Sequence, residues 1–144
     1  MLFFGIAAYG TEGDPIVREQ LENKKHQLAH WAKFYGVGKI FMPLIALGGT
    51  VAAGAAYAKT KENLWLIGGA TLISIIPFTF IVMKKTNDRL NAILDNCKDP
   101  ELGEAEKEEV TSSFKRWINM HRGRVALALG AAGLFFAAKS VTKS

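Results

Sequence analysis

Three side chains in the last third of the chain have the types and the spacing to do chemistry together. Trp117, His121 and Arg124 are four and three residues apart, so on a helix they share one face. A tryptophan can stack on an aromatic ligand, an imidazole can accept a proton, and a guanidinium can stabilise an oxyanion. The same residues also fit an interfacial tryptophan beside an arginine and a histidine bound to lipid headgroups. Spacing alone leaves both interpretations open.

Asn87 is a second candidate, because it directly follows a long uncharged stretch and lies between Thr86 and Asp88. As an amide donor it could face the same cavity as His121. The alternative is that these three polar residues cap a helix over 88–97, since such side chains are favoured at helix N-termini.

Histidines at positions 26 and 30 are one helical turn apart and could bind a metal ion together with His121. The carboxylate spacing of a di-metal bundle does not accompany them, so we expect a solvated helix face and no metal. The single cysteine, Cys97, excludes an intrachain disulfide and a cysteine-based metal site, and we expect it to be a half-buried apolar contact. Phosphate loops, nucleophile elbows, zinc-finger spacings and dinucleotide fingerprints do not occur in the sequence, so an ordinary hydrolase, kinase or dehydrogenase is not supported.

The elements that must position these residues are apolar helices. Of the 144 residues, 49% are apolar and 22% are charged, and the two kinds are segregated along the chain. Residues 40–58 and 64–83 carry no charge, and at about 1.5 Å per residue each helix would span roughly 28 to 30 Å, the thickness of a bilayer core. A third span over 125–141 includes Lys139, which can snorkel. We expect an all-α membrane helical bundle, with residues 1–144 in one domain.

The remaining segments are predicted to be a partial span and shorter helices. Residues 1–10 are apolar but too short to cross a membrane and lack a signal peptide's basic start, so they are predicted to end a partial first transmembrane helix. An amphipathic helix is expected over 15–38 with Asp14 as its N-cap, and a short helix over 86–97. The acidic stretch 104–109 should begin a helix that continues into the last span.

Two features inside the spans predict how the helices pack. Gly48, Ala52 and Ala56 are four residues apart, a spacing that lets helices approach closely in lipid. Pro77 lies inside the span over 64–83 and should kink it, because proline cannot donate the helical hydrogen bond.

Positive charges are divided unequally between the segments outside the spans. With four crossings, segments 11–39 and 84–124 lie on one side and hold 14 of the 18 lysines and arginines. The positive-inside rule places both segments in the cytoplasm, or in the matrix of an organelle. The net charge of +5 then reflects topology and contact with membrane lipid, and we expect no nucleic-acid partner.

Several short motifs follow one another in a distinctive order. They are Trp31-x-x-x-Tyr35-Gly36 before a span that holds Pro43, Ile76-Pro77-Phe78-Thr79, Thr86-Asn87-Asp88-Arg89-Leu90, and Trp117-x-x-x-His121-x-x-Arg124 before the last apolar span. Together they resemble the anthrone oxygenase-like family of small four-helix membrane proteins, over roughly residues 5–140. The chain departs from that family's pattern in two places: most of the first transmembrane helix is absent, and Lys85 stands where a proline usually precedes the Thr-Asn pair.

The resemblance implies a cofactor-free oxidation of an apolar aromatic substrate, from anthrone to anthraquinone. A base takes a proton from an acidic phenolic or methylene position, and the resulting carbanion reacts directly with oxygen. By position, His121 would be the base, and Arg124 and Asn87 would stabilise the anion. The side chains expected to bind the substrate's rings are Trp117, Trp31 and Tyr35.

A second interpretation is a non-catalytic accessory or structural subunit of a larger membrane complex, or of a homo-oligomer. It is favoured by the partial first helix, the stripe of small residues and the acidic segment 101–109, which could dock a basic partner. A cavity beside His121 would distinguish the two interpretations, because an enzyme needs room for its substrate and a scaffold does not.

Overall fold

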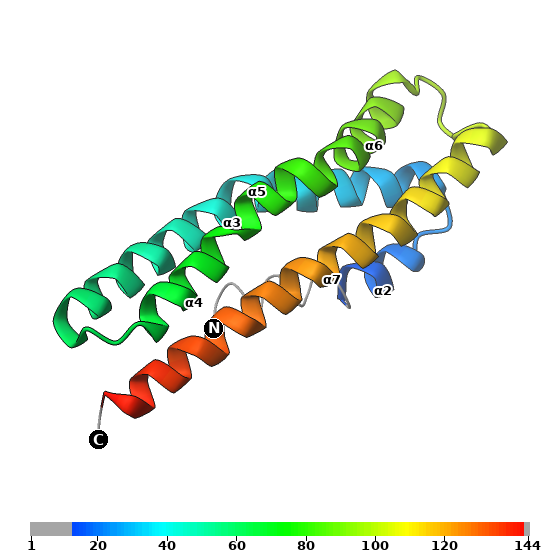
Figure 1. Cartoon of the computed structure of the whole chain (residues 1–144). Coiled ribbons are helices and arrows are strands. Elements are labelled where there is room, and N and C mark those ends of the chain that lie inside the picture. The colour runs from blue at the N-terminus through cyan, green and yellow to red at the C-terminus, as the bar shows by residue number, and fades with distance from the viewer. Residues whose placement is uncertain (1–12, 143–144) are drawn as a thin grey trace.

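The computed structural model describes residues 13–142, and these form a bundle of helices (Figure 1). No strand occurs among these residues, so the predicted all-α class is confirmed. The helices in chain order are α2 (Asp14–Glu19), α3 (Lys24–Thr60), α4 (Leu64–Ile73), α5 (Ile75–Phe78), the π-helical turn η2 (Thr79–Met83), α6 (Lys84–Asn96) and α7 (Glu104–Val141).

Three helices are long and apolar enough to cross a membrane: α3, the nearly continuous helix from Leu64 to Asn96, and α7. They contain the predicted spans 40–58, 64–83 and 125–141. Many large apolar side chains lie on their outer surface, as expected of helices that face lipid; among the most exposed are Ile81, Phe136 and Val51. The predicted partial span over 1–10 lies outside the described residues.

Two clusters of buried side chains hold the bundle together at different levels. The first lies where α3, α6 and α7 meet, and its aromatic members are Trp31, Phe114 and Trp117. The second lies where α3, α4, α5 and α7 meet, and it consists of Met42, Ala46, Leu72, Ile75, Ala128 and Ala131. In Figure 1 α4 runs beside α3 and close to α7, so the second cluster fills the space between these three helices.

Close helix packing around α4 depends on glycines outside the predicted stripe. A Cβ atom added at Gly48 would meet none of the described residues within 4 Å, so this glycine does not bring α3 close to another described helix. A Cβ atom at Gly49 would lie 2.6 Å from Leu72, and one at Gly68 would lie 2.5 Å from the ring of Phe135. The predicted stripe therefore lies on a different face of α3 from the face that packs against α4.

The predicted disruption at Pro77 is confirmed. The helix is interrupted after Ile73, resumes at Ile75 and becomes π-helical after Phe78. The hydroxyl of Thr79 donates to the carbonyl of Ile75 at 2.8 Å, which satisfies one acceptor of this irregular segment. The wider turn places Thr79 at the edge of the cavity described below.

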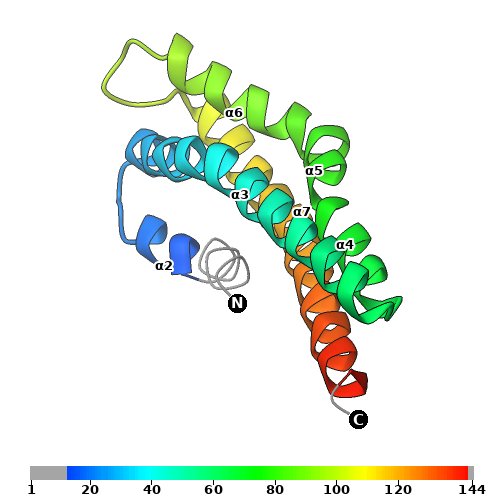
Figure 2. The same cartoon turned by 90° about the vertical axis from the view of Figure 1, so that its left-hand side faces the viewer.

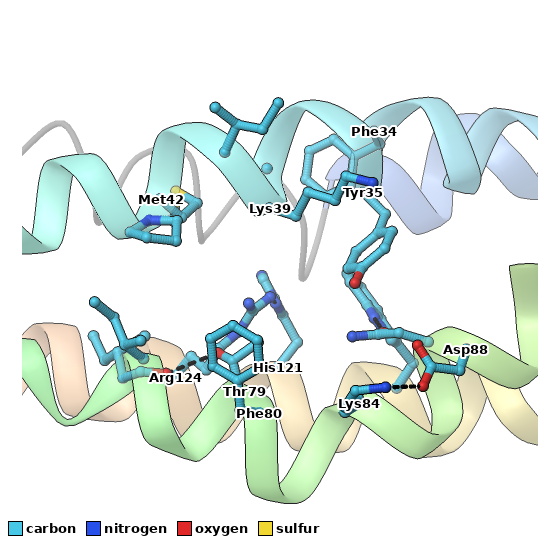
Figure 3. Close-up of a pocket in the computed structure, with 17 residues that line it drawn as sticks. Phe34, Tyr35, Lys39, Met42, Thr79, Phe80, Lys84, Asp88, His121 and Arg124 are labelled. Atoms are coloured by element: carbon cyan, nitrogen blue, oxygen red, sulfur yellow. Dashed lines mark hydrogen bonds and ion pairs between the residues drawn. The ribbon is translucent and has the colours of Figure 1, made fainter.

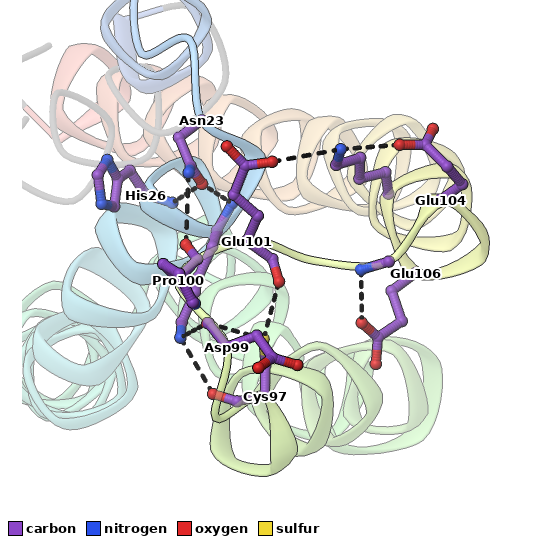
Figure 4. Close-up of polar contacts among 11 residues, drawn as sticks. Asn23, His26, Cys97, Asp99, Pro100, Glu101, Glu104 and Glu106 are labelled. Atoms are coloured by element: carbon purple, nitrogen blue, oxygen red, sulfur yellow. Dashed lines mark hydrogen bonds and ion pairs between the residues drawn. The ribbon is translucent and has the colours of Figure 1, made fainter.

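The predicted single helix over 15–38 is two helices, so this prediction was wrong. The break precedes α3 at Asn23, whose side-chain oxygen accepts from the backbone N–H groups of Lys25 and His26 at 2.8 and 3.3 Å (Figure 4). An asparagine in this position caps a new helix. Its amide nitrogen also donates to the carbonyl of Pro100 at 3.4 Å, which connects the start of α3 to the loop before α7.

Asp14 is not the N-cap that the sequence predicted, because it lies within the first turn of α2 and is fully buried. Its Oδ1 lies 3.0 Å from Nε2 of His30, and its Oδ2 lies 3.4 Å from the guanidinium of Arg18. Burial lowers the pKa of Arg18, against the opposing effect of the Asp14 carboxylate. The Arg18 guanidinium also lies over the ring of Phe114, and in Figure 2 α2 is folded back beneath α3.

Candidate active site

A cavity of about 400 Å³ lies between the two buried clusters, where the apolar spans meet their polar extensions (Figure 3). A ligand pocket of this size fits a small polycyclic molecule. Its apolar walls are formed by Phe34, Met42, Pro43, Ile75, Ile76 and Phe80. Its polar end is formed by Asn87, His121 and Arg124 from α6 and α7 and by Tyr35 and Lys39 from α3, so a bound ligand would meet both apolar walls and polar groups.

The hydrogen bond between Trp117 and Asn87 fixes the orientation of the amide at the polar end. The indole Nε1 donates to Asn87 Oδ1 at 3.0 Å, and both residues are almost fully buried. An indole N–H can only donate, so Oδ1 must face Trp117 and the amide nitrogen must lie on the other side. The Tyr35 phenol, which reaches into the cavity from α3 (Figure 3), lies near this side chain.

The alternative role of Asn87 as a helix cap was wrong. Helix α6 begins at Lys84, directly after η2 and with no capping turn, so Thr86, Asn87 and Asp88 lie inside it. Thr86 and Asn87 are buried, whereas Asp88 is exposed and pairs with Lys84. The polar triplet is therefore one turn of helix that passes the cavity.

His121 is held between Trp117 and Arg124. Its ring stacks on the indole, with centroids 4.7 Å apart and planes 11° apart. The Nη2 atom of Arg124 contacts Nδ1 of His121. A guanidinium is always protonated and only donates, so Nδ1 is the acceptor and a neutral imidazole carries its hydrogen on Nε2. The three side chains predicted to share one face of α7 are thus in contact, with His121 touching both Trp117 and Arg124.

Five of the six predicted site residues line the cavity: Tyr35, Asn87, Trp117, His121 and Arg124. Trp31 does not line it. The fully buried Trp31 stacks on Tyr35 with centroids 5.2 Å apart, and it meets Trp117 edge-on at 6.1 Å. It therefore supports two rings of the site from behind, where a ligand in the cavity would not touch it.

Three further charged residues that line the cavity were not singled out by spacing. Lys39 reaches it from α3, whereas Lys84 and Asp88 reach it from α6. A signal for the two lysines was nevertheless present, because Lys39 directly precedes the uncharged stretch 40–58 and Lys84 directly follows the stretch 64–83. Since these two helices run antiparallel (Figure 1), both lysines lie at the same end of their spans, where they line one cavity.

Comparison with known proteins identifies the family. The model of the anthrone oxygenase family matches residues 31–134. The chain belongs to the anthrone oxygenase family. Its curated relatives include anthrone oxygenase dmxR16 of Cryptosporiopsis, 28% identical over 85% of this chain and 70% of the relative. Anthrone oxygenase gedH of Aspergillus terreus is 28% identical over 90% of this chain and 84% of the relative. No solved structure matches the chain.

The part of the chain that matches the anthrone oxygenase family begins at Trp31 and contains all six predicted site residues. His26 lies outside it and is exposed, and His30 contacts Asp14. Over residues 13–142 no three His, Cys, Asp or Glu side chains come together in a way that could hold a metal ion.

We expect Trp117→Phe to destabilise this anthrone oxygenase family member more than Trp31→Phe does. Both substitutions remove an indole from the same aromatic cluster. The indole N–H of Trp117 bonds to Asn87, whereas that of Trp31 has no hydrogen-bond partner among the described residues. Leaving the buried Asn87 oxygen without its donor costs about 1–3 kcal/mol.

The thermal unfolding midpoints of the two variants in detergent, followed by far-ultraviolet circular dichroism, measure this difference. An equal or larger fall for Trp31→Phe would contradict the importance of the Trp117–Asn87 hydrogen bond.

Proposed function

We propose that this member of the anthrone oxygenase family is a membrane-embedded, cofactor-free oxygenase that converts the methylene group of an anthrone-like phenolic polycycle into a carbonyl. The cavity beside His121 is the observation that carries the proposal. Its apolar walls suit fused aromatic rings, and its buried polar end suits the oxygen atoms of such a substrate. A purely structural subunit would need no such space, so the cavity favours catalysis over the accessory-subunit alternative.

The proposed reaction needs only the substrate and molecular oxygen. Loss of a proton from the methylene group gives an electron-rich carbanion whose charge is shared with the ring oxygen. Electrons from this anion reduce oxygen, and the new carbon–oxygen bond gives a peroxide. Protonation of the peroxide, loss of the second methylene hydrogen and cleavage of the O–O bond release water and leave a carbonyl. One CH₂ group and one O₂ thus become one C=O group and one water.

The residues at the polar end would stabilise the charge that develops in this reaction. Asn87 and Arg124 are donors that can bind the substrate oxygen, and such donors act strongly in a site that excludes water. Trp117 and Tyr35 would pack against the rings. His121 would contact the reacting end of the substrate.

The same proposal includes an orientation in the membrane. Segments 11–39 and 84–124, which carry most of the positive charge, would face the cytoplasm or an organelle matrix. Lys39 and Lys84 would then lie at the lipid–water boundary on that side, where an amphipathic substrate dissolved in the membrane could present its polar end.

Oxygen consumption tests the proposed function. Purified protein in detergent should consume oxygen with an anthrone, faster than the spontaneous reaction, and the absorbance of an anthraquinone should rise in step. His121→Ala should reduce the rate to the spontaneous level, whereas His26→Ala, at an exposed histidine of α3, should retain it. A folded protein that gives no oxygen uptake above the spontaneous rate would rule out this substrate class.

A further inference from the structure

We propose that the cavity takes its substrate directly from the bilayer, through a lateral mouth between α3 and η2, and that Ile40 and Phe80 form the rim of this mouth. The class of substrate, a phenolic polycycle, rests on the proposed function. The mouth itself can be tested with a dye and without turnover. The proposal adds to the site a route of entry and two side chains that control access.

The first observation is a gap between α3 and one turn of the neighbouring helix. Helices α4 and α5, which precede η2, and helix α6, which follows it, all pack against α3. Between them, every Cα atom of η2 lies more than 8 Å from every Cα atom of α3. The gap coincides with the π-helical turn that follows Pro77, and such turns frequently occur at functional sites. Because Thr79 and Phe80 of this turn line the cavity, the two backbones are separated at the level of the cavity.

The second observation is that the cavity is deeply buried on one side and exposed on the other. Asn87 and His121, which line it from α6 and α7, are both only 2% exposed. Ile40 and Phe80, which line it from α3 and η2, are 56% and 64% exposed. In Figure 3 the labelled Lys39 and Phe80 belong to the two helices that face each other across the cavity. The cavity therefore reaches the surface of the bundle between these two helices.

Packed side chains close the other directions. The first buried cluster, with Trp31 and Phe114, closes the polar end of the cavity, and the second cluster, with Leu72 and Ala131, closes the opposite end. Helix α7 packs against both α4 and η2 and forms the back wall. Among the described residues, the exposed side chains that line the cavity all belong to α3, η2 and α6, and none belongs to α7. The mouth is thus lateral and does not open along the bundle axis.

The mouth lies at the depth where an amphipathic ring system collects in a bilayer. Ile40 and Phe80 belong to the two uncharged stretches, whereas Lys39 and Lys84 lie directly outside them. The rim therefore lies just inside the apolar part of the spans, next to the charged boundary. Aromatic rings that carry a polar group concentrate at this boundary. A phenolic polycycle that diffuses in the lipid would meet the mouth from the side and enter the cavity without crossing water.

Narrowing the mouth tests the proposal. The probe is 1,8-dihydroxyanthraquinone, mixed rapidly with protein in phospholipid nanodiscs and followed by its own visible fluorescence. The phase that is absent from protein-free nanodiscs reports entry into the protein. Ile40→Trp combined with Phe80→Trp places larger rings on both sides of the rim, at exposed positions where the fold should tolerate them. We expect this rim pair to slow association at least about tenfold, because access to the site is obstructed.

The matched control moves both substitutions by one residue. Phe41→Trp combined with Ile81→Trp makes the same change in composition, at exposed side chains that do not line the cavity. We expect its association rate to stay within about twofold of the wild-type rate. Ile40→Ala combined with Phe80→Ala widens the mouth and should associate at least as fast as wild type, which a misfolded protein would not do.

Gly38→Phe shows whether the signal comes from the cavity, because the new ring takes up space at a lining position and should abolish the phase. The proposal is overturned if wild type gives no such phase, or if the phase survives Gly38→Phe. It is also overturned if the rim pair is slowed less than tenfold, if the control pair is slowed as much, or if the alanine pair is slower than wild type.

Turnover separates this proposal from the proposed function. If the protein oxidises an anthrone and the rim pair keeps the wild-type kcat/KM in nanodiscs, the function stands and the lateral mouth is overturned. If dye uptake depends on the rim in a protein that never oxidises an anthrone, the mouth is supported and the function is contradicted.

Discussion

Replacement of Gly38 with phenylalanine is expected to abolish turnover and to leave the bundle folded. Gly38 lines the cavity on α3, and a Cβ atom added there would meet nothing within 4 Å. Because Gly38 lines the cavity and the described residues leave room for a side chain there, the new ring would occupy space that the substrate needs. Because a shift of about 1 Å in substrate position can cost on the order of 10²-fold, we expect at least that loss in kcat/KM.

Gly36→Phe is the matched control for this substitution. Gly36 lies two residues earlier on α3, none of the described residues lies within 4 Å of a Cβ atom added to it, and it does not line the cavity. We expect a kcat/KM close to that of the wild type, measured by oxygen uptake at several anthrone concentrations. If Gly38→Phe also kept the wild-type value, the substrate would have to bind somewhere other than this cavity.

Arg124→Met should give the second large loss, about 10²–10³-fold in kcat, which is typical when one donor to a developing oxyanion is removed. Arg124 supplies positive charge at the buried polar end of the cavity and is also the donor that holds His121 Nδ1. Methionine keeps an unbranched apolar side chain and a high helix propensity, so α7 should remain intact.

Arg122→Met is the control for the loss of charge. Arg122 lies on the same helix, is exposed and does not line the cavity. We expect its kcat to stay close to the wild-type value in the same oxygen-uptake assay. Equal losses in the two variants would show that the effect is a general one of charge near the membrane surface, and not stabilisation of an anion in the cavity.

Much of the site followed from local spacing. Trp117, His121 and Arg124 share a face because an α-helix repeats every 3.6 residues, and the structure places all three beside the cavity. Asn87 lines the same cavity as His121, although the capping alternative could be dismissed only from the structure. Trp31 shows the limit of the same reasoning. Its spacing from Tyr35 places both rings on one face of the helix, but it does not indicate which of the two rings reaches the cavity.

Errors occurred where a residue's partner lies on another helix. Asp14 has the sequence position of an N-cap, but a buried contact with His30 of α3 decides its orientation. Gly48 has the spacing of a packing residue, but it is Gly49 that approaches α4.

The sequence by itself determined the three apolar helices, the break at Pro77 and the family motifs. These features follow from the free-energy cost of placing a charge in the bilayer or a proline inside a helix. That cost is set locally by each residue and adds up along the chain. The tertiary structure alone decided which glycines allow close packing, which indole N–H is paired, and that Lys39 and Lys84 border one cavity. Those properties depend on the rotation and depth of each helix relative to its neighbours, and an average hydropathy contains no information about either.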